Sequence, residues 1–370
     1  RDSEEHHCPS IAGVEMSRGF VADLTREFGV ALDEILPFVD LLQAARRDIP
    51  VDSSVRREIF QLGWPALALS EKEGGLGLGI EALAAVAAVA GSHLLPMAIR
   101  EESFLLAPAL AAAAASDDAD ATRSLDLLLV GEGVGGGRAA ESGLVLEPVG
   151  NRIRVQLEQM MVWLSPGATD AVIVTPEAAA VVPLVGDDVF VESAVALDRG
   201  QGAHRLTVDV ILPSSRCFDG DYSFNWWQRW RLVELAGLVG AATAVLDLTL
   251  DHASARKQFG KPITKFQAVS HMLAEMKMRT ELARSAVSLL VANAASGDDI
   301  DDLGVALAYA VPKLVRETIE YSIQIHGGTG FTWEYGLHLY YRRVLQSQVG
   351  LGGVAGSATK VGEQLLASRS

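Results

Sequence analysis

The middle of the chain, from Leu125 to about Gly220, is the part of the sequence that most limits the possible folds. It holds short segments rich in Val, Ile and Leu, separated by Gly, Pro, Asn or Asp. These segments are LDLLLV, GLVLEPV, RIRVQL, DAVIVT, AAVVPLV, DVFVES and LTVDVIL. Such segments are typical of β-strands, and no helix-length segment lies between them. The pattern predicts a compact β domain rather than a sheet of alternating strands and helices.

Helical patterns lie on both sides of this region. From about Ser17 to Ala115 apolar residues recur at helical spacing, interrupted by GWPALALSEKEGGLGLG, which predicts a structured loop. After Trp226 come three long helical segments, and small residues on the first predict close approach of another helix: Ala236, Gly237, Gly240, Ala241 and Ala244. The order of classes predicts an α+β fold with an N-terminal α domain (1–117), a middle β domain (118–220) and a C-terminal α domain (221–370).

The amino-acid composition argues against several classes of ligand and partner. The net charge of −16 argues against nucleic acid and against an anionic membrane surface. Cys8 and Cys217 are far apart and show no metal-binding or disulfide spacing. The first residues show no apolar signal core, and no charge-free run long enough to span a membrane occurs. We therefore expect a cytoplasmic protein with no metal ion, no membrane and no nucleic acid.

The segment GEGVGG, Gly131–Gly136, matches the G-x-G-x-x-G spacing of dinucleotide-binding folds. In those folds a helix must begin directly after the glycines, so that its amides face the pyrophosphate. Here RAAESG follows, and then another strand-like segment. The sequence therefore favours a flexible loop of the β domain over a dinucleotide site.

Two other motifs each admit two interpretations. In RKQFGKPI, Arg256 and Gln258 at a Gly-containing turn can present a guanidinium and an amide to phosphate oxygens; alternatively, the cations simply complement the dipole at a helix C-terminus. In IQIHGGTGF, the glycines allow a ligand to touch the backbone and Gln324 can bind an amide or hydroxyl edge. The alternative there is an ordinary helix end, with His326 as its cation.

Taken in order, these stretches resemble the acyl-CoA dehydrogenase family, from about Ser17 to Ser368. The similar segments are GWPALALSEKEGGLGLG, RLVELAGLVGAATAVLDLTLDHASARKQFGKPITKFQAVSHMLAEM and IQIHGGTGFTWEYGLHLYYRRV. The resemblance implies a middle β barrel or sandwich, a C-terminal four-helix bundle, an acyl-CoA substrate and an FAD that lies across a subunit boundary. It implies that this chain contacts the pyrophosphate and adenosine of a neighbour's FAD through Arg256, Gln258, Phe259, Ile263, Phe266, Gln267, Gln324, Gly327 and Gly328.

The other half of the family's site differs. The segments expected to hold the flavin ring read LVGEGVGGGRAAE and MMVWLSPGATD, with no clear hydroxyl for the flavin. Leu351 or Gly352 stands where the family has its catalytic Glu, and Trp230 stands at the alternative position on the long helix. Proton abstraction from a thioester needs a carboxylate at one of these places.

The resemblance therefore implies one subunit of a hetero-oligomer, with an α2β2 tetramer favoured. It is similar to the heteromeric dehydrogenases that bacteria use on bulky, steroid-side-chain acyl-CoA thioesters. Two alternatives remain open. One is a self-sufficient homo-oligomeric dehydrogenase with Glu234 as base, one helical turn past Trp230. The other is a flavin-free paralogue that serves only as a scaffold.

Overall fold

The computed structural model describes residues 18–140 and 142–367 of the chain. Its N-terminal part is helical, and the Gly-rich stretch predicted as a structured loop contains two short 3-10 turns. The elements are α1 (Arg18–Ile35), α2 (Phe38–Arg47), α3 (Ser53–Gln61), η1 (Trp64–Ala66), η2 (Glu71–Glu73), α4 (Ile80–Ser92), α5 (Met97–Glu101), η3 (Glu102–Leu106), α6 (Ala107–Ala114) and α7 (Ala119–Leu129).

Helix α7 corrects one expectation, because it contains most of LDLLLV, which we predicted to be a strand. Asp118 begins the helix, and its carboxylate accepts a hydrogen bond from the backbone N–H of Ala121 at 2.9 Å. Ala121, Leu125 and Leu128 then lie on one buried face. Their spacing is helical, so the leucines of LDLLLV do not alternate in burial as those of a strand would. The first residues of the predicted β domain are therefore helical.

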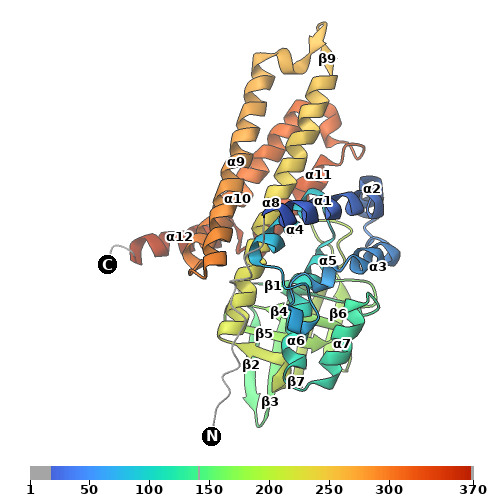
Figure 1. Cartoon of the computed structure of the whole chain (residues 1–370), viewed down its shortest axis with the longest axis vertical. Helices are drawn as coiled ribbons and strands as arrows, with labels where there is room; N and C mark the ends of the chain where they lie inside the picture. Colours follow the sequence, from blue (N-terminus) through green and yellow to red (C-terminus); the bar gives the residue numbers. More distant parts are fainter. Residues whose placement is uncertain (1–17, 141, 368–370) are drawn as a thin grey trace.

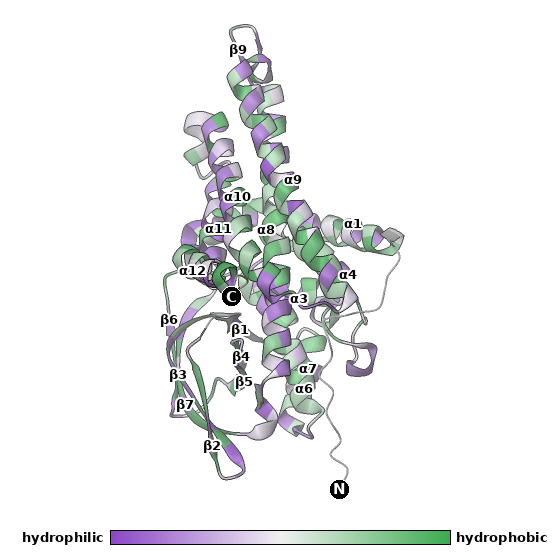
Figure 2. Cartoon of the chain, turned by 90° about the vertical axis from the view of Figure 1, so that its left-hand side faces the viewer, coloured by the Kyte–Doolittle hydropathy of each residue, from purple (hydrophilic) through white to green (hydrophobic). Residues whose placement is uncertain are grey.

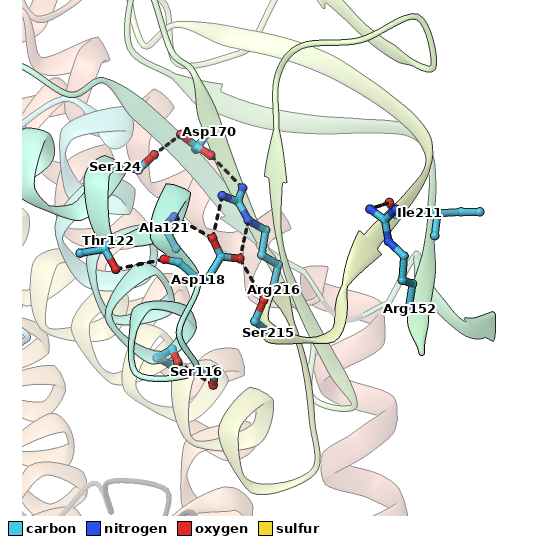
Figure 3. Close-up of polar contacts among 11 residues, drawn as sticks. Ser116, Asp118, Ala121, Thr122, Ser124, Arg152, Asp170, Ile211, Ser215 and Arg216 are labelled. Atoms are coloured by element: carbon cyan, nitrogen blue, oxygen red, sulfur yellow. Dashed lines mark hydrogen bonds and ion pairs between the residues drawn. The ribbon is translucent and has the colours of Figure 1, made fainter. Parts of the chain in front are cut away.

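A buried arginine joins α7 to the sheet (Figure 3). The guanidinium of Arg216 lies 3.1 Å from the Asp118 carboxylate and 3.4 Å from that of Asp170. Ser124 on α7 donates to Asp170 at 3.0 Å, and Ser215 donates to Asp118 at 2.9 Å. All three charged side chains are almost completely buried. The contact fixes the helix cap against the β domain.

The β domain is one eight-stranded sheet in the order β6-β7-β3-β1-β4-β5-β8, with β2 paired to β3. Most pairs are antiparallel, while β1 and β4 are parallel. Apolar residues that alternate along β3 and β7 fill the core on one face. The strands are β1 (Gly135–Ala139), β2 (Leu144–Val149), β3 (Arg152–Leu164), β4 (Asp170–Val174), β5 (Ala178–Pro183), β6 (Val189–Ser193), β7 (Ala203–Pro213) and β8 (Cys217–Asp219).

Strand β1 corrects part of a second expectation, the flexible loop predicted at GEGVGG, because residues 131–134 form a loop but the last two glycines belong to the strand. Gly135 and Gly136 are buried strand residues between β3 and β4. A Cβ on Gly136 would come within 2.0 Å of the Trp163 carbonyl oxygen. These glycines therefore permit a close approach of neighbouring backbones. As expected, the next regular element is the strand β2 and not a helix.

The C-terminal part is a helical bundle with a hairpin at its far end (Figure 1). Helix α8 runs from the sheet to the hairpin β9–β10, and α9 returns beside it. The elements are α8 (Asp221–Ala255), β9 (Lys257–Gln258), β10 (Lys261–Pro262), η5 (Ile263–Lys265), α9 (Gln267–Ser296), α10 (Asp301–His326), η6 (Gly327–Phe331), α11 (Leu337–Gly350) and α12 (Gly353–Ala367).

The prediction that small residues allow a helix to approach α8 is confirmed. A Cβ on Gly240 would lie 1.8 Å from the Ala88 carbonyl oxygen of α4, and one on Gly91 would lie 1.9 Å from the Gly237 oxygen. Figure 2 shows that α4 and the adjoining part of α8 are mainly hydrophobic. In the described residues α8 is long and apolar enough to span a membrane, but 78% of its most apolar window is buried inside the protein.

Candidate functional site

The hairpin after α8 presents an aromatic side chain at the tip of the bundle. Gln258 pairs with Lys261, and the two residues between them form a tight turn in which both φ angles are positive, 50° at Phe259 and 78° at Gly260. Positive φ is uncommon for a residue other than Gly and often marks a functional turn. The Phe259 side chain is 91% exposed and contacts the Phe266 ring edge-to-face.

The second predicted FAD segment lies at the same end of the bundle as the hairpin. Helix α10 ends at His326, and the His326 ring stacks on the ring of His252, one turn before Arg256, with 4.1 Å between ring centres. Gln324 is exposed. No atom lies within 4 Å of a Cβ built on Gly327 or Gly328. The structure therefore places Arg256 and Gln324 on neighbouring helix ends.

This arrangement fits one half of an FAD site. The exposed Arg256 guanidinium and the Gln258 amide suit the oxygens of a pyrophosphate. Open glycines beside Gln324 suit the approach of a flat group to the backbone. The predicted residues that complete the segment follow the hairpin on η5 and at the start of α9: Ile263, Phe266 and Gln267. In Figure 1 the hairpin lies at the opposite end of α8 from the sheet, so these residues are remote from this chain's own β domain.

The positions at which the resemblance leads us to expect a base lie where the N-terminal helices, the sheet and the C-terminal bundle meet. Trp230 on α8 is buried, and its ring lies 3.3 Å from the point where a Cβ on Gly350 would be. Leu351, the next residue, is buried as well. The two alternative base positions are therefore neighbours in space, and an indole and an aliphatic side chain occupy them.

Three buried charged residues and the half-buried Arg138 lie around Trp230. Together with Trp230 we call them the junction cluster: Arg100, Glu101, Arg138, Trp230 and Glu234. Arg100 on α5 donates to the Glu234 carboxylate on α8. The indole N–H of Trp230 donates to Glu101 Oε1 at 3.2 Å, while Glu101 Oε2 has no partner among the described residues. Burial and the charge of Glu234 raise the pKa of Glu101 to about 7, although Arg100 opposes them.

The environment of Glu234, our alternative base, suits an ion-pair partner better than a proton acceptor. Its side chain is 1% exposed. Burial raises the pKa of Glu234, but the charge of the neighbouring Arg100 guanidinium is the main effect that lowers it, and the pKa is lowered overall. A carboxylate that is paired and stabilised in its charged form is a poor proton acceptor. The geometry therefore argues against Glu234 as the base.

A second buried ion pair closes the junction beside this cluster. Arg343 on α11 pairs with Asp198 and donates to the Leu95 carbonyl at 3.0 Å and to Gln201 Oε1 at 3.0 Å. Gln201 Oε1 also accepts from the backbone N–H of Met97 at 2.9 Å. These contacts hold α5 against the loop that follows β6 and against α11.

The segment expected to face a flavin ring is covered by α5. Trp163 is fully buried and packs in a cluster with Met97 and Ala98. Ser165 follows two residues later and is a hydroxyl that our sequence interpretation missed. It is buried close to the Glu102 carboxylate. Glu102 accepts from Arg56 at 2.9 Å and from the Gly135 N–H at 2.8 Å. A cavity of about 560 Å³ lies beside this segment, and its lining includes Ala98, Ile99, Leu164 and Ser165.

The sequence contained one overlooked signal for the junction cluster. REES, Arg100–Ser103, interrupts the otherwise apolar run HLLPMAIREESFLLAPALAAAA. Charged residues inside a buried helix are rare unless they are paired. Adjacent unlike charges in such a run predict buried ion pairs, but their partners come from α3, β1 and α8 and cannot be read locally.

The family described as acyl-CoA dehydrogenase, C-terminal domain, matches residues 227–364. This region, which comprises most of the C-terminal helical bundle, is similar to that domain. Within curated proteins, the chain is 39% identical to the acyl-CoA dehydrogenase FadE34 of Mycobacterium tuberculosis over 137 residues, which are 35% of this chain and 19% of that protein. The chain spans 19–37% of the length of the first three curated relatives. It is 26% identical to the acyl-CoA dehydrogenase FadE28 of the same organism over 311 residues, 79% of this chain and 86% of that protein.

Solved structures share the fold over nearly the whole chain. A variant of the Tcur3481-Tcur3483 steroid ACAD has a TM-score of 0.76 at 22% identity, over 94% of this chain and 99% of that one. The ChsE4-ChsE5 complex from Mycobacterium tuberculosis has a TM-score of 0.80 at 19% identity, over 95% and 98%. PigA with FAD and proline has a TM-score of 0.79 at 18% identity, over 95% and 98%. The predicted fold class, that of acyl-CoA dehydrogenases, is confirmed.

Proposed function

We propose that this chain is a subunit of an FAD-dependent acyl-CoA dehydrogenase that supplies half of the FAD site to a homologous catalytic subunit. The observation that carries this proposal is the contrast between its two half-sites. Arg256, Gln258 and Gln324 are exposed at the end of the bundle. At the domain junction, by contrast, Trp230 and Leu351 are buried at the positions where the resemblance expects a base, and Glu234 is held in an ion pair with Arg100.

In such an assembly this chain binds and orients the cofactor of its neighbour. The FAD held there would supply the hydride acceptor for dehydrogenation of the acyl group, and a carboxylate of the partner would remove the α-proton. Arg256 offsets the pyrophosphate charge, and Gln324 with the adjacent glycines holds the adenosine end. An α2β2 tetramer then contains one complete FAD site for each pair of unlike chains.

The relatives support an oligomer and a bulky substrate. Two neighbours of the same fold are described by pairs of chain names, Tcur3481-Tcur3483 and ChsE4-ChsE5, and the first is called a steroid ACAD. PigA was solved with FAD. By this likeness we propose acyl-CoA thioesters with bulky, steroid-derived side chains as the substrate class.

The proposal is tested by counting flavin per chain. The chain is produced alone and together with homologous chains encoded beside it, and FAD is measured by absorbance against total protein. We expect little FAD and negligible acyl-CoA dehydrogenation from the lone chain, and one FAD per unlike pair in an active complex. A lone chain that is yellow and fully active, with one FAD per subunit, would overturn the proposal.

A self-sufficient dehydrogenase remains the second candidate, with Glu101 in place of Glu234 as its base. Glu101 is a carboxylate of raised pKa, hydrogen-bonded to Trp230 at the point where the family's base positions meet. Burial on every side opposes this role, because a base must reach the substrate. If the lone chain is active, Glu101→Gln should abolish turnover while Glu132→Gln, which changes an exposed carboxylate on the loop before β1, should not.

A further inference from the structure

The ends of α8 and α10 are joined by two successive contacts that lead up to the proposed FAD half-site. Thr249 on α8 and Ser322 on α10, both fully buried, share a hydrogen bond of 2.6 Å between their hydroxyls. One turn further, the rings of His252 and His326 stack at 4.1 Å between centres, with 28° between their planes. The predicted FAD residues that follow on the two segments are Arg256 and Gly327.

A third ring encloses the stacked histidines. Tyr335, from the segment before α11, lies edge-on to His252 and His326 at 5.6 Å and 5.1 Å between centres. His326 Nδ1 lies 2.9 Å from the Ser322 carbonyl oxygen. A carbonyl only accepts, so Nδ1 carries the hydrogen and Nε2 presents a lone pair. Nε2 is buried without a partner in the described chain.

We propose that His252 and His326 are positioning residues that set Arg256 relative to Gln324, Gly327 and Gly328 and so complete the trans half of the FAD site. The inference rests on the proposed function. The stack joins the helix ends that carry the two FAD segments, and Tyr335 restricts the movement of both rings. Loss of the stack would let the two helix ends move independently, so that the pyrophosphate and adenosine contacts no longer form together.

The electrostatics of the pair make the contact sensitive to acid. Burial lowers the pKa of His252, and the neighbouring His326 and Arg256 lower it further. Burial also lowers the pKa of His326, against the opposing hydrogen bond to the Ser322 carbonyl. Both rings are therefore neutral near pH 7. Protonation of one places a cation against the other ring and near Arg256, which opposes the stacked arrangement.

The test measures release of FAD from the wild-type complex and from variants, by the fluorescence of free flavin after dilution at about pH 8 and about pH 5.5. His326→Ala removes the stack, and we expect release about threefold to tenfold faster at both pH values. The double variant His252→Phe with His326→Phe keeps two stacked rings that cannot take a proton. It should hold FAD like the wild type at the higher pH and lose the acceleration at the lower pH.

The matched control is His204→Phe, which removes an imidazole on β7 in the β domain and should leave both release rates unchanged. A stack with only a structural role would lower the melting temperature of His326→Ala and leave flavin release unaltered, and that result would overturn the inference. The inference would also be overturned if the double Phe variant released FAD at the lower pH as fast as the wild type does. If the wild-type complex itself holds no FAD, the proposed function fails and this inference fails with it.

Discussion

Two neighbouring cations at the end of α8 make it possible to distinguish the proposed FAD contact from a simple helix cap by substitution. Arg256 and Lys257 are both exposed and both near the helix C-terminus. A cap requires only positive charge near the dipole, whereas a pyrophosphate contact requires the guanidinium fork at one position. Arg256→Ala should weaken FAD retention by the complex roughly tenfold or more, the scale of one charge-assisted hydrogen bond. The bound flavin is measured by absorbance after gel filtration.

Lys257→Ala is the matched control, because it removes the same charge from the adjacent residue. We expect it to retain FAD. Equal loss of flavin in the two variants would indicate a diffuse charge effect instead of a specific contact. Unchanged FAD in Arg256→Ala with a lowered melting temperature would support the helix-cap interpretation.

Glu101 gives a prediction about pH that does not depend on the cofactor. Its pKa is about 7 in the folded protein and about 4.5 without the surrounding structure. The folded state then holds the proton more tightly, so this residue's contribution to stability is greatest below pH 4.5 and is lost as the pH rises through 7. Glu101→Gln removes that loss and keeps an acceptor for Trp230. The gain in the free energy of unfolding of this variant over wild type should therefore be larger at about pH 8 than at about pH 5, by up to about 3 kcal/mol.

Urea unfolding of wild type and Glu101→Gln at the two pH values measures this difference. The control is Glu132→Gln, which changes an exposed carboxylate and should give no pH-dependent gain. A Glu101→Gln variant that is less stable than wild type at both pH values would show that the carboxylate is needed in its charged form within the junction cluster.

At the scale of elements, Arg216 is the link between α7 and the sheet. Arg216→Met leaves the carboxylates of Asp118 and Asp170 buried without their cation, which costs about 3–5 kcal/mol of the free energy of unfolding. The matched control is Arg154→Met, because Arg154 pairs with Asp209 on an exposed strand surface. Such exposed pairs contribute about 0–1 kcal/mol. Equal effects of the two substitutions in urea unfolding would contradict this account.

The same elements show how far the sequence alone reaches. Helices α8, α9 and α10 are the three long helical segments predicted after Trp226, because a long helical pattern carries its own signal. Helix α7 was misread, since a short Leu-rich run does not distinguish a strand from a helix. The junction cluster could not be predicted, because the partners of Arg100 and Glu101 are brought together only by the packing of three domains.

At the scale of the whole molecule, the long helices carry apolar residues that this chain does not cover. Met278, Leu282 and Leu289 on α9 are each 53–54% exposed, and their spacing of four and seven residues places them on one face of the helix. A half-site for FAD at the end of the same bundle needs a second subunit close by. We therefore interpret this face, which we call the α9 stripe, as part of the subunit interface.

Charge on the α9 stripe should separate the subunits without unfolding them. In Leu282→Asp with Leu289→Asp, two carboxylates would have to be desolvated in the interface, at a cost that exceeds the apolar contact they replace. We expect the mass from light scattering to fall to that of a smaller assembly, and FAD to be lost because its two half-sites part, while the circular dichroism spectrum of the folded chain stays unchanged. Val185→Asp with Val195→Asp is the control, since these valines are 72% and 83% exposed on loops of the β domain. An unchanged mass in the α9 variant would place the interface elsewhere, and an equal loss of mass in both variants would show that added charge alone disrupts the assembly.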